Sequence, residues 1–558
     1  MKRLPRVPSA FLALVLLAPG AETAQAQVAS NMILRSNLDS YSAYNDIWGY
    51  TDQGTGNEYA LLGTTTGLSV VNIVNRNAPY ETGFFPGANS TWRDIKTYGN
   101  YAYVTNESSG GIAIIDLSDP ENPVAAGAYT GGGFSRAHNL YIDTATGLLY
   151  TAGANLGSGG TRILDLSNPT APVEIGSWET AYFHDVMVQN GRLYGSAINN
   201  AVLYVLDVTN PASISVLGSV GGYPNAFTHN AWVTPDDNYV MSTDETNGAA
   251  CRMWDLSGLP NLVETDNYLP NPATIPHNTH IVGNLAVISH YELGVRMVDI
   301  GDPYNLIEVG YYDTWPSGNG GGFNGCWGAY PFFGNSPNII VASDLSTGLY
   351  VLEFQPNYGT VTGTVTHAGI PSATIAGADV EVVETATQGT SGPTGTYRLI
   401  DAPGSYTLQV GAYGYQTSSD PVNLSAGVTL DFNVELTPVP GGKVSGTVTA
   451  QSSGLAVPGA TVQVLATPLS QAADGAGDYS YLSVPTGSYT VRCSAFGYNT
   501  VETTVNVGNG SDLTVDFVMN AAAIVDELEG GAGGWTTQVV GGPSSGFWEL
   551  GDPQGTSA

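Results

Sequence analysis

The sequence predicts an all-β protein, in which a seven-bladed β-propeller precedes two β-sandwiches and a truncated C-terminal fragment. The first observation is a run that recurs seven times, in which four or five apolar residues precede an acidic or amide residue and, in most copies, a tail similar to Ser-Asn-Pro. A period in the forties with several short apolar runs per unit is typical of propeller blades. The aligned acidic or amide positions lie 42 to 54 residues apart, at Asn72, Asp116, Asp165, Asp207, Asp255, Asp299 and Glu353.

The second observation is a module that occurs twice, over residues 357–437 and 438–520. Gly359-TVTGTVTHAG corresponds to Gly442-KVSGTVTAQS, and Gly404-SYTLQVGAYGYQT corresponds to Gly487-SYTVRCSAFGYNT. Alternating apolar residues at this spacing predict short antiparallel strands, so each copy is expected to form a small Ig-like β-sandwich.

Residues 1–26 have the composition of a secretory signal peptide. Lys2, Arg3 and Arg6 form a charged start, an apolar stretch follows, and Ala24-Gln-Ala26 is a cleavage site of small residues. The apolar stretch is too short to span a bilayer, and no later stretch is typical of a membrane helix. We therefore expect a protein that is secreted, extracellular or held at the cell surface, without a transmembrane segment in the mature chain.

Residues 27–356 are expected to form the propeller, and each unit repeats one order of strands. The innermost strand comes first, for example His138-NLYID, followed by a second strand and by the third strand with its terminal acidic residue. The Ser-Asn-Pro tail predicts a turn, because its side chains form hydrogen bonds with the local backbone and proline ends the strand. The last unit lacks an outer strand, and Asn31-MILRSN is expected to supply it and close the ring.

Residues 521–558 resemble the start of a jelly-roll-like module or a linker, and we expect this module to be incomplete. The three cysteines have no disulfide spacing, and Cys493 lies in an alternating strand, where a core position is expected. The net charge of −33 argues against nucleic acid as a partner, because lysine and arginine supply the affinity for phosphate. A surface with this excess of acidic residues could also bind calcium, for example at Asp-rich turns such as Asp116-LSDPEN.

The repeated units resemble LVIVD-repeat propellers, and residues 27–356 are similar to the choice-of-anchor B surface proteins of bacteria. The paired modules resemble carboxypeptidase regulatory-like domains, which implies a transthyretin-like sandwich for each. The resemblance implies an architecture and a secreted or anchored location, and it implies no defined activity.

Histidines gather at one end of the predicted ring. His138, His184 and His229 begin the innermost strands of three successive units, and His277 and His280 occupy the same region of the next. Because the innermost strands all run the same way along the axis, these side chains are expected at one mouth of the channel. The loops between second and third strands return to the same face, since neighbouring strands are antiparallel.

A concave mouth with converging polar groups is the default place for a site. We predict a transition metal there, Zn, Cu, Fe or Mn, with ligands His138, His184, His229 and His280. Further polar side chains predicted at the mouth would orient these ligands or serve as a general base, namely Asp185, Glu107 and Glu292. A second set is predicted to contact a ligand directly, namely Asp46, Arg93, Asp94, Arg136, Asp244 and Trp327.

A structural alternative competes with the metal. His138, His184 and His229 precede the aligned aspartates of their own units by 23 to 27 residues, so pairs such as His138 with Asp165 and His184 with Asp207 could form buried hydrogen bonds within a blade.

Two functions follow from these observations. The first is recognition of an extracellular glycan, peptide or surface protein at the channel mouth, with the sandwiches as a spacer. The alternative is a histidine-metal-dependent hydrolase or oxidoreductase at the same mouth, in which a metal-bound water or a redox metal acts on the substrate. The first hypothesis is favoured. No nucleophile elbow, P-loop or His-Glu-x-x-His motif is visible in the sequence.

Overall fold

The computed structural model describes residues 29–318 and 320–522, so the predicted signal peptide and nearly all of the C-terminal fragment lie outside the described residues. The described chain is all-β, and its helical segments are the 3-10 turns η1 (Gly131–Gly133) and η2 (Ile198–Asn200). None of its helices has the length and the apolar composition of a membrane span.

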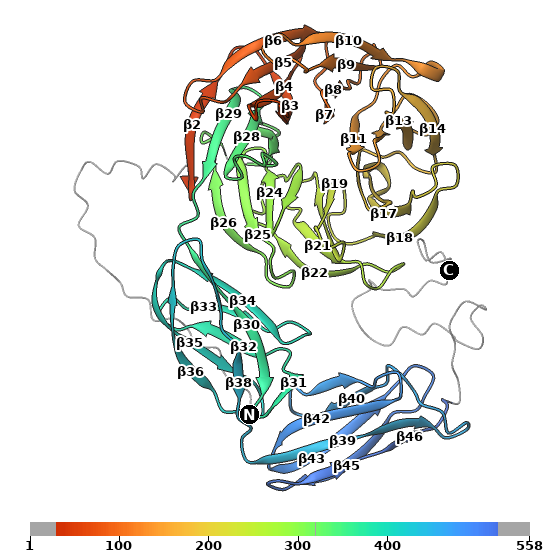
Figure 1. Cartoon of the computed structure of the whole chain (residues 1–558). Coiled ribbons are helices and arrows are strands. Elements are labelled where there is room, and N and C mark those ends of the chain that lie inside the picture. The colour runs from red at the N-terminus through yellow and green to blue at the C-terminus, as the bar shows by residue number, and fades with distance from the viewer. Residues whose placement is uncertain (1–28, 319, 523–558) are drawn as a thin grey trace, which may run out of the picture.

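Antiparallel sheets succeed one another along the first part of the chain, and Figure 1 shows them set around a ring. The first strand of each sheet contacts the first or second strand of a neighbouring sheet, and β27 contacts β3. These innermost strands are β3 (Tyr44–Thr51), β7 (Ile95–Tyr98), β11 (Asn139–Asp143), β15 (Asp185–Gln189), β19 (Thr228–Val233), β23 (Thr279–Val282) and β27 (Cys326–Tyr330). The predicted strand order, with the innermost strand first, is confirmed.

The remaining strands of the ring follow in chain order outward from the axis, except that the outer strand of the last sheet is β2 from the N-terminal segment. The second strands are β4 (Glu58–Thr64), β8 (Tyr101–Val104), β12 (Leu148–Ala152), β16 (Arg192–Ala197), β20 (Tyr239–Asp244), β24 (Leu285–Ser289) and β28 (Ile339–Asp344). The third strands are β5 (Gly67–Asn72), β9 (Ile112–Asp116), β13 (Thr161–Asp165), β17 (Val202–Asp207), β21 (Cys251–Asp255), β25 (Val295–Asp299) and β29 (Gly348–Phe354). The outer strands are β6 (Tyr80–Pro86), β10 (Val124–Tyr129), β14 (Val173–Trp178), β18 (Ser215–Gly221), β22 (Val263–Tyr268), β26 (Ile307–Tyr312) and β2 (Met32–Leu38).

The N-terminal segment closes the ring, as predicted. Strand β2 pairs antiparallel with β29, so Ile33 lies opposite Glu353, and the short strand β1 (Ala29–Ser30) extends the preceding sheet beside β26. Arg35 Nε donates a 2.5 Å hydrogen bond to Glu353 Oε2 across this junction. The last sheet thus joins both ends of the propeller chain, which removes an exposed strand edge.

The aligned aspartates cap the turns that follow the third strands. Asp116 Oδ1 accepts a hydrogen bond from Ser118 N at 2.8 Å, and Asp165 Oδ1 accepts one from Ser167 N at 2.6 Å. The same contact recurs at Asn72, Asp207, Asp255 and Asp299. An Asx side chain that bonds the backbone two residues further on stabilises a turn, so the repeated residue serves the fold.

Pro211, in the tail of the following unit, packs against the preceding sheet at a bulge. Strands β13 and β14 shift register between Ile163 and Leu164, beside Gly176. A Cβ on Gly176 would lie 2.0 Å from the carbonyl oxygen of Pro211 in the next unit. Glycine at the bulge therefore permits close packing between neighbouring sheets.

Each duplicated module forms two packed sheets around its own core. In the first module, β30 (Gly359–His367) pairs with β31 (Ile370–Thr374), β34 (Thr396–Asp401), β37 (Thr429–Asp431) and β38 (Val434–Leu436). Its other sheet has the order β33 (Thr387–Thr390), β32 (Asp379–Val382), β35 (Gly404–Gly411), β36 (Ser418–Leu424).

The second module repeats this arrangement. Its first sheet contains β39 (Gly441–Ala450), β42 (Asp478–Pro485), β45 (Asp512–Thr514) and β46 (Phe517–Met519), and its other sheet contains β41 (Ser470–Ala472), β40 (Thr461–Val464), β43 (Gly487–Ser494) and β44 (Val501–Val507). Cys493 belongs to its core, as predicted, and all three cysteines are buried and free.

The first sandwich docks against the propeller beside β25 and β26 (Figure 1). Arg398 donates two hydrogen bonds to the Asp299 carboxylate, at 2.7 and 2.6 Å, and Asn305 Nδ2 donates to the Arg398 carbonyl at 3.2 Å. Ile400 joins a hydrophobic core cluster that otherwise consists of propeller residues. Asp299 ends its strand opposite Leu285, whereas the histidines begin the innermost strands, so the sandwich contacts the end of the ring away from the histidines.

Candidate functional site at the propeller mouth

Four histidine rings lie side by side where the innermost strands begin, and neighbouring rings are tilted by 46–51°. The ring centroids of His138 and His184 are 3.8 Å apart, those of His184 and His229 are 4.2 Å apart, and those of His229 and His277 are 4.4 Å apart. We call His138, His184, His229 and His277 the histidine ladder. It contains three of the four predicted metal ligands, and each member comes from a different sheet.

His280, the fourth predicted ligand, lies elsewhere. Its ring packs against Trp48, Trp232 and Phe332, with centroid distances of 5.8, 4.7 and 5.7 Å. His277 instead holds the ladder position in this sheet. The two histidines are three positions apart, about 10 Å along an extended chain, so they enter different layers of the channel.

Glu107, predicted as an orienting group or base, contacts the first member of the ladder. Its Oε1 atom lies 2.6 Å from His138 Nδ1. This hydrogen bond lowers the pKa of Glu107 below its ordinary value. Glu107 follows the second strand β8, which confirms that loops between second and third strands reach the histidine end of the ring.

Two ladder histidines and a carboxylate could hold one metal ion. One ligand atom each from His184, His229 and Glu245 lies within 4.8 Å of the other two. Glu245 follows β20, so it reaches the mouth from the same type of loop as Glu107. His229 Nε2 and Glu245 Oε2 are 3.6 Å apart, which is too far for a hydrogen bond.

The nitrogens of this cluster are buried without protein partners. His229 is 2% exposed and neither of its ring nitrogens has a hydrogen bond, and His184 Nδ1 has none either. Burial lowers the pKa of His229 to about 3, and burial together with the neighbouring histidines holds the pKa of His184 well below its ordinary value. Both rings are therefore neutral near pH 7, the form that binds metals.

Tyr291 fixes Glu245 from the next sheet. Its hydroxyl donates a 2.5 Å hydrogen bond to Glu245 Oε1. Tyr291 has a φ of +36°, a strained value for a bulky residue, and backbone hydrogen bonds with Cys326 of 3.1 and 2.9 Å hold it in place. A partner that orients a ligating carboxylate is a typical part of a metal site.

A layer of side-chain oxygens lies directly beneath the ladder. These residues line a small cavity together with the histidines, and we call them the oxygen layer: Asp46, Asp94, Asn139, Asp185 and Asn278. Asp185 Oδ2 accepts a 2.9 Å hydrogen bond from Asn230 Nδ2, and burial raises the pKa of Asp185 to about 6. The layer contains Asp46 and Asp94, two of the predicted ligand contacts, and Asp185, a predicted base.

Lys96 enters the oxygen layer from below. Its ammonium lies 2.5 Å from Asp94 Oδ1, 4.0 Å from Asp46 Oδ2 and 4.4 Å from the Trp48 ring centroid. Beneath it lies a group of aromatic rings that contact one another in edge-to-face, tilted or stacked pairs, namely Trp48, Trp232, Phe332 and Tyr330. These aromatic rings pack the channel below the oxygen layer, so the site opens toward the histidine end.

The remaining predicted residues have other partners. Arg93 donates to the carbonyls of Thr64 and Ala88 at 3.0 and 2.7 Å, and Asp244 accepts from Phe227 N at 2.7 Å. Both are buried and hold mouth loops in place.

Glu292 also organises a loop, since it accepts hydrogen bonds from Gly320 N at 2.7 Å and from Asn324 Nδ2 at 2.8 Å. Trp327 stands beside the ladder, 4.9 Å from His277 between ring centroids. Arg136 is exposed and donates to the Glu107 carbonyl at 3.4 Å.

The alternative of histidine–aspartate pairs within a blade is wrong. Asp165 caps a turn, whereas His138 bonds Glu107. The aspartates end the third strands and the histidines begin the first strands, which places the two sets at opposite ends of the sheets.

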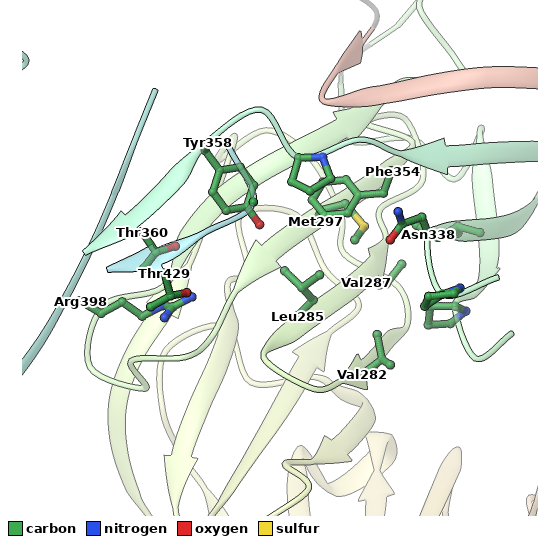
Figure 2. Close-up of a pocket in the computed structure, with 15 residues that line it drawn as sticks. Val282, Leu285, Val287, Met297, Asn338, Phe354, Tyr358, Thr360, Arg398 and Thr429 are labelled. Carbon is green, nitrogen blue, oxygen red and sulfur yellow. The ribbon is translucent and has the colours of Figure 1, made fainter. Parts of the chain in front are cut away.

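A larger cavity of about 230 Å³ lies between the propeller and the first sandwich, and Figure 2 shows the residues that line it. Apolar side chains such as Leu285, Val287 and Met297 form most of the wall, with Tyr358 and Arg398 on the sandwich side. The Arg398 guanidinium already pairs with Asp299. This cavity therefore lacks the converging unpaired polar groups of the mouth.

Sequence reasoning singled out none of three members of the site, namely Glu245, Tyr291 and Lys96. One signal for Lys96 exists in the sequence: it falls on a channel-facing position of an innermost strand, where a lone lysine requires buried anionic partners.

Comparisons with known proteins give two kinds of match. Residues 360–437 and 443–520 match the carboxypeptidase regulatory-like domain, and residues 91–131 and 157–180 match the LVIVD repeat. Bacillopeptidase F of Bacillus subtilis (strain 168) is 35% identical over 133 residues, which make up 23% of this chain and 9% of that protein. The chain thus spans less than a tenth of the length of this curated relative.

Among solved structures, a crystal structure of a protein from Lactobacillus plantarum matches with a TM-score of 0.40 and 14% identity, over 54% of this chain and 88% of that chain. The sequence matches agree with the sheets of the ring and with the paired sandwiches. The chain therefore combines LVIVD repeats with two carboxypeptidase regulatory-like domains.

Proposed function

We propose that this is an extracellular or surface-displayed binding protein whose propeller mouth holds a transition metal on His184, His229 and Glu245. The observation that carries the proposal is the convergence of their three ligand atoms within 4.8 Å, together with buried ring nitrogens that have no other partner. A buried polar atom without a hydrogen bond costs free energy, which a bound ion would recover.

The donor set suits Zn, Cu, Fe or Mn. Two imidazoles and one carboxylate leave at least one coordination position for an outside ligand. In this proposal, a partner donates an oxygen or nitrogen atom to that position, for example from a peptide carboxylate or a glycan hydroxyl. The exposed rings of Trp92, Phe227 and Phe323, which lie in loops leading to innermost strands, would contact the rest of the partner.

The architecture supports an outward-facing mouth. We infer that the sheets of the ring are seven blades closed by β2, and that the sandwiches form a spacer. The ion pair between Arg398 and Asp299 supports this role, because it joins the spacer to the end of the ring opposite the histidines. A spacer at that end leaves the mouth free to meet a partner.

A hydrolase or oxidoreductase at the same mouth is the second candidate. Asp185 favours it, because this residue lines the same cavity as His184 and its pKa is raised to about 6, close to that of an effective general base. A metal-bound water activated by such a base would attack an ester or phosphate.

The proposal is tested by metal analysis of the full chain, followed by calorimetric titration with Zn²⁺. We expect one tightly bound transition metal per chain, with an affinity that falls at least tenfold in His184→Ala, His229→Ala and Glu245→Gln. His367→Ala, in the first sandwich, is the matched control and should bind as the wild type does. Equal binding in all variants, or no binding by the wild type, would overturn the proposal.

Experiments with the metal-loaded protein then distinguish a binding function from an enzymatic function. Retention of a glycan or peptide from an array, lost in Glu245→Gln, supports recognition. Turnover of ester or phosphate substrates that is lost in both Glu245→Gln and Asp185→Asn supports the hydrolase instead.

A further inference from the structure

A groove lies where the first sandwich meets the propeller, at the end of the ring away from the histidines. Its volume is about 590 Å³, within the range of about 300–1,000 Å³ that is typical of ligand sites. Strands β33, β32 and β35 of the sandwich form the floor, and the propeller turn at Tyr304 and Asn305 forms the wall. None of the residues of the proposed metal site lines this groove.

The floor presents a row of polar side chains from three neighbouring strands. Val380 and Val382 belong to the core of the sandwich, so the alternation along β32 turns Glu381 toward the groove. Gln388 on β33 and Gln409 on β35 both lie directly opposite Glu381. Residues directly opposite each other share one face of a sheet, so these three side chains lie side by side, and we call them the polar row.

The polar row is free to bind a ligand. The carboxylate of Glu381 and the amide of Gln388 have no hydrogen-bond partner among the described residues, and Gln409 Nε2 donates a 3.3 Å bond to Ser419 Oγ. Asp379 and Thr390, which lie opposite each other in the adjacent row, add a second carboxylate and a hydroxyl.

The wall of the groove is aromatic and is held in place. Tyr304 is 37% exposed, and its backbone N donates a 3.0 Å hydrogen bond to Asp302 Oδ1. Its ring lies close to the sandwich, because a Cβ on Gly392 would be 3.6 Å from Tyr304 Cδ2. The hydrogen bond from Asn305 Nδ2 to the Arg398 carbonyl fixes this turn against the sandwich. Wall and floor are thus in position before a ligand binds, which lowers the conformational cost of binding.

The chemistry of the lining selects an uncharged ligand rich in hydroxyl groups. The described residues that line the groove include two carboxylates, Asp379 and Glu381, and no basic side chain, which disfavours an anionic ligand. A carboxylate only accepts hydrogen bonds, whereas a glutamine amide both donates and accepts. Hydroxyl groups satisfy both, but an ammonium group has no acceptor for the amide N–H groups. A sugar ring also has an apolar face of C–H groups, which suits the ring of Tyr304.

The second sandwich carries different residues at the corresponding positions. Gln463 stands at the position of Glu381, and it lies opposite Ser470 and Arg492. Arg492 is already paired with Glu502 at 2.7 Å. The repeated fold therefore does not require the polar row, which is particular to the first sandwich and its groove.

We propose that this groove is a second binding site, independent of the metal site at the mouth, and that it binds a neutral glycan. The sugar hydroxyls pair with Glu381, Gln388 and Gln409, and one sugar ring packs against Tyr304. The first sandwich is then a glycan-binding module as well as a spacer, and the propeller supplies one wall of its site.

The test is affinity electrophoresis of the full chain in native gels that contain a soluble polysaccharide. The probes are xylan, β-glucan and mannan, which are neutral, and polygalacturonate, which is acidic. We expect at least one neutral polysaccharide to retard the wild type, and Glu381→Ala or Tyr304→Ala to weaken the binding roughly tenfold, because each removes a central contact. The two residues belong to different domains, so misfolding of one variant leaves the other as a test.

Matched controls come from equivalent and exposed positions. Gln463→Ala, at the corresponding place in the second sandwich, and Tyr80→Ala, an exposed tyrosine of the propeller, should be retarded as the wild type is. The proposal is overturned if no neutral polysaccharide retards the wild type, if only polygalacturonate does, or if Glu381→Ala and Tyr304→Ala bind as tightly as the controls. Binding of polylysine alone, lost in Glu381→Ala, would identify a cationic partner instead.

Failure of this site is distinguishable from failure of the metal site. Retardation by the neutral polysaccharide should persist in EDTA and in Glu245→Gln, and Glu381→Ala should bind Zn²⁺ as the wild type does. Retardation that requires the metal and is lost in Glu245→Gln would place the glycan at the propeller mouth and contradict a separate groove.

Discussion

Tyr291 and Glu245 come from neighbouring sheets and meet through a 2.5 Å hydrogen bond at the propeller mouth. The contact holds the carboxylate of Glu245 beside His184 and His229. Tyr291 itself adopts a strained φ of +36°, so the fold maintains this contact at a conformational cost.

Tyr291→Phe should weaken metal binding without unfolding the ring. The variant keeps the aromatic packing and removes only the hydroxyl, so Glu245 loses its orienting partner. Loss of such an outer contact typically reduces metal affinity about 10–100-fold. Zn²⁺ titration by calorimetry measures the change. Tyr413→Phe, in the first sandwich, is the control, and equal affinities in the two variants would contradict the proposed role.

Acid should destabilise the propeller steeply. Burial lowers the pKa of His229, His277, His280 and His290 to about 3. The folded state thus prefers the neutral rings, and the unfolded chain takes up protons near pH 6.5. The contribution of these neutral rings to the free energy of unfolding is fully present above pH 6.5. It is lost as the pH falls from 6.5 toward 3, by about 1.4 kcal/mol per pH unit for each histidine.

Urea unfolding at pH 7 and pH 5.5 measures this slope in metal-free protein. His290→Phe is the informative variant, because both nitrogens of His290 are buried without partners and its ring lies outside the histidine ladder. The variant should lose less stability on acidification than the wild type. Identical losses would show that His290 is already charged in the folded protein.

Arg398→Ala should release the first sandwich from the propeller. The variant leaves the buried Asp299 carboxylate without its two hydrogen bonds from the guanidinium. Removal of one partner from a buried ion pair costs about 3–5 kcal/mol. We expect the sandwich and propeller transitions to separate in calorimetry, and protease cleavage between residues 355 and 358 to accelerate.

Arg492→Ala is the matched control for the ion pair. Arg492 bonds Glu502 at 2.7 Å on the surface of the second sandwich, with both side chains more than 40% exposed. Exposed ion pairs contribute about 0–1 kcal/mol, so this variant should melt almost as the wild type does. Comparable effects of the two substitutions would contradict the docking role of Arg398.

Gly176→Ala should destabilise the ring through a clash between sheets. The added Cβ would lie 2.0 Å from the Pro211 carbonyl oxygen, so strand β14 or the next turn must move. Overpacking of this kind costs about 1–3 kcal/mol. Gly334→Ala, which places a Cβ in open space in the same propeller, should change the Tm little. A Gly176→Ala protein as stable as this control would show that the bulge adapts freely.

The fold was predictable because its causes are local. Asp116 and Asp165 each cap the turn two residues further on, and the alternation of apolar and polar residues defines the strands. The structure of each repeat unit can therefore be predicted from its own residues. The position of His138 and His184 at the start of innermost strands was predictable for the same reason. The pairing of β2 with β29 followed from counting strands per unit.

The sequence by itself therefore determined the strand order, the turn chemistry and the end of the ring at which the histidines gather. Only the tertiary structure decided which groups meet there, because residues about 45 positions apart come together through sheet-to-sheet packing and not through sequence spacing. In the folded ring, His277 and not His280 belongs to the histidine ladder, and Tyr291 contacts Glu245. Lys96 is buried beside the three carboxylates of the oxygen layer. Each of these contacts depends on distances across the channel, which closure of the ring sets.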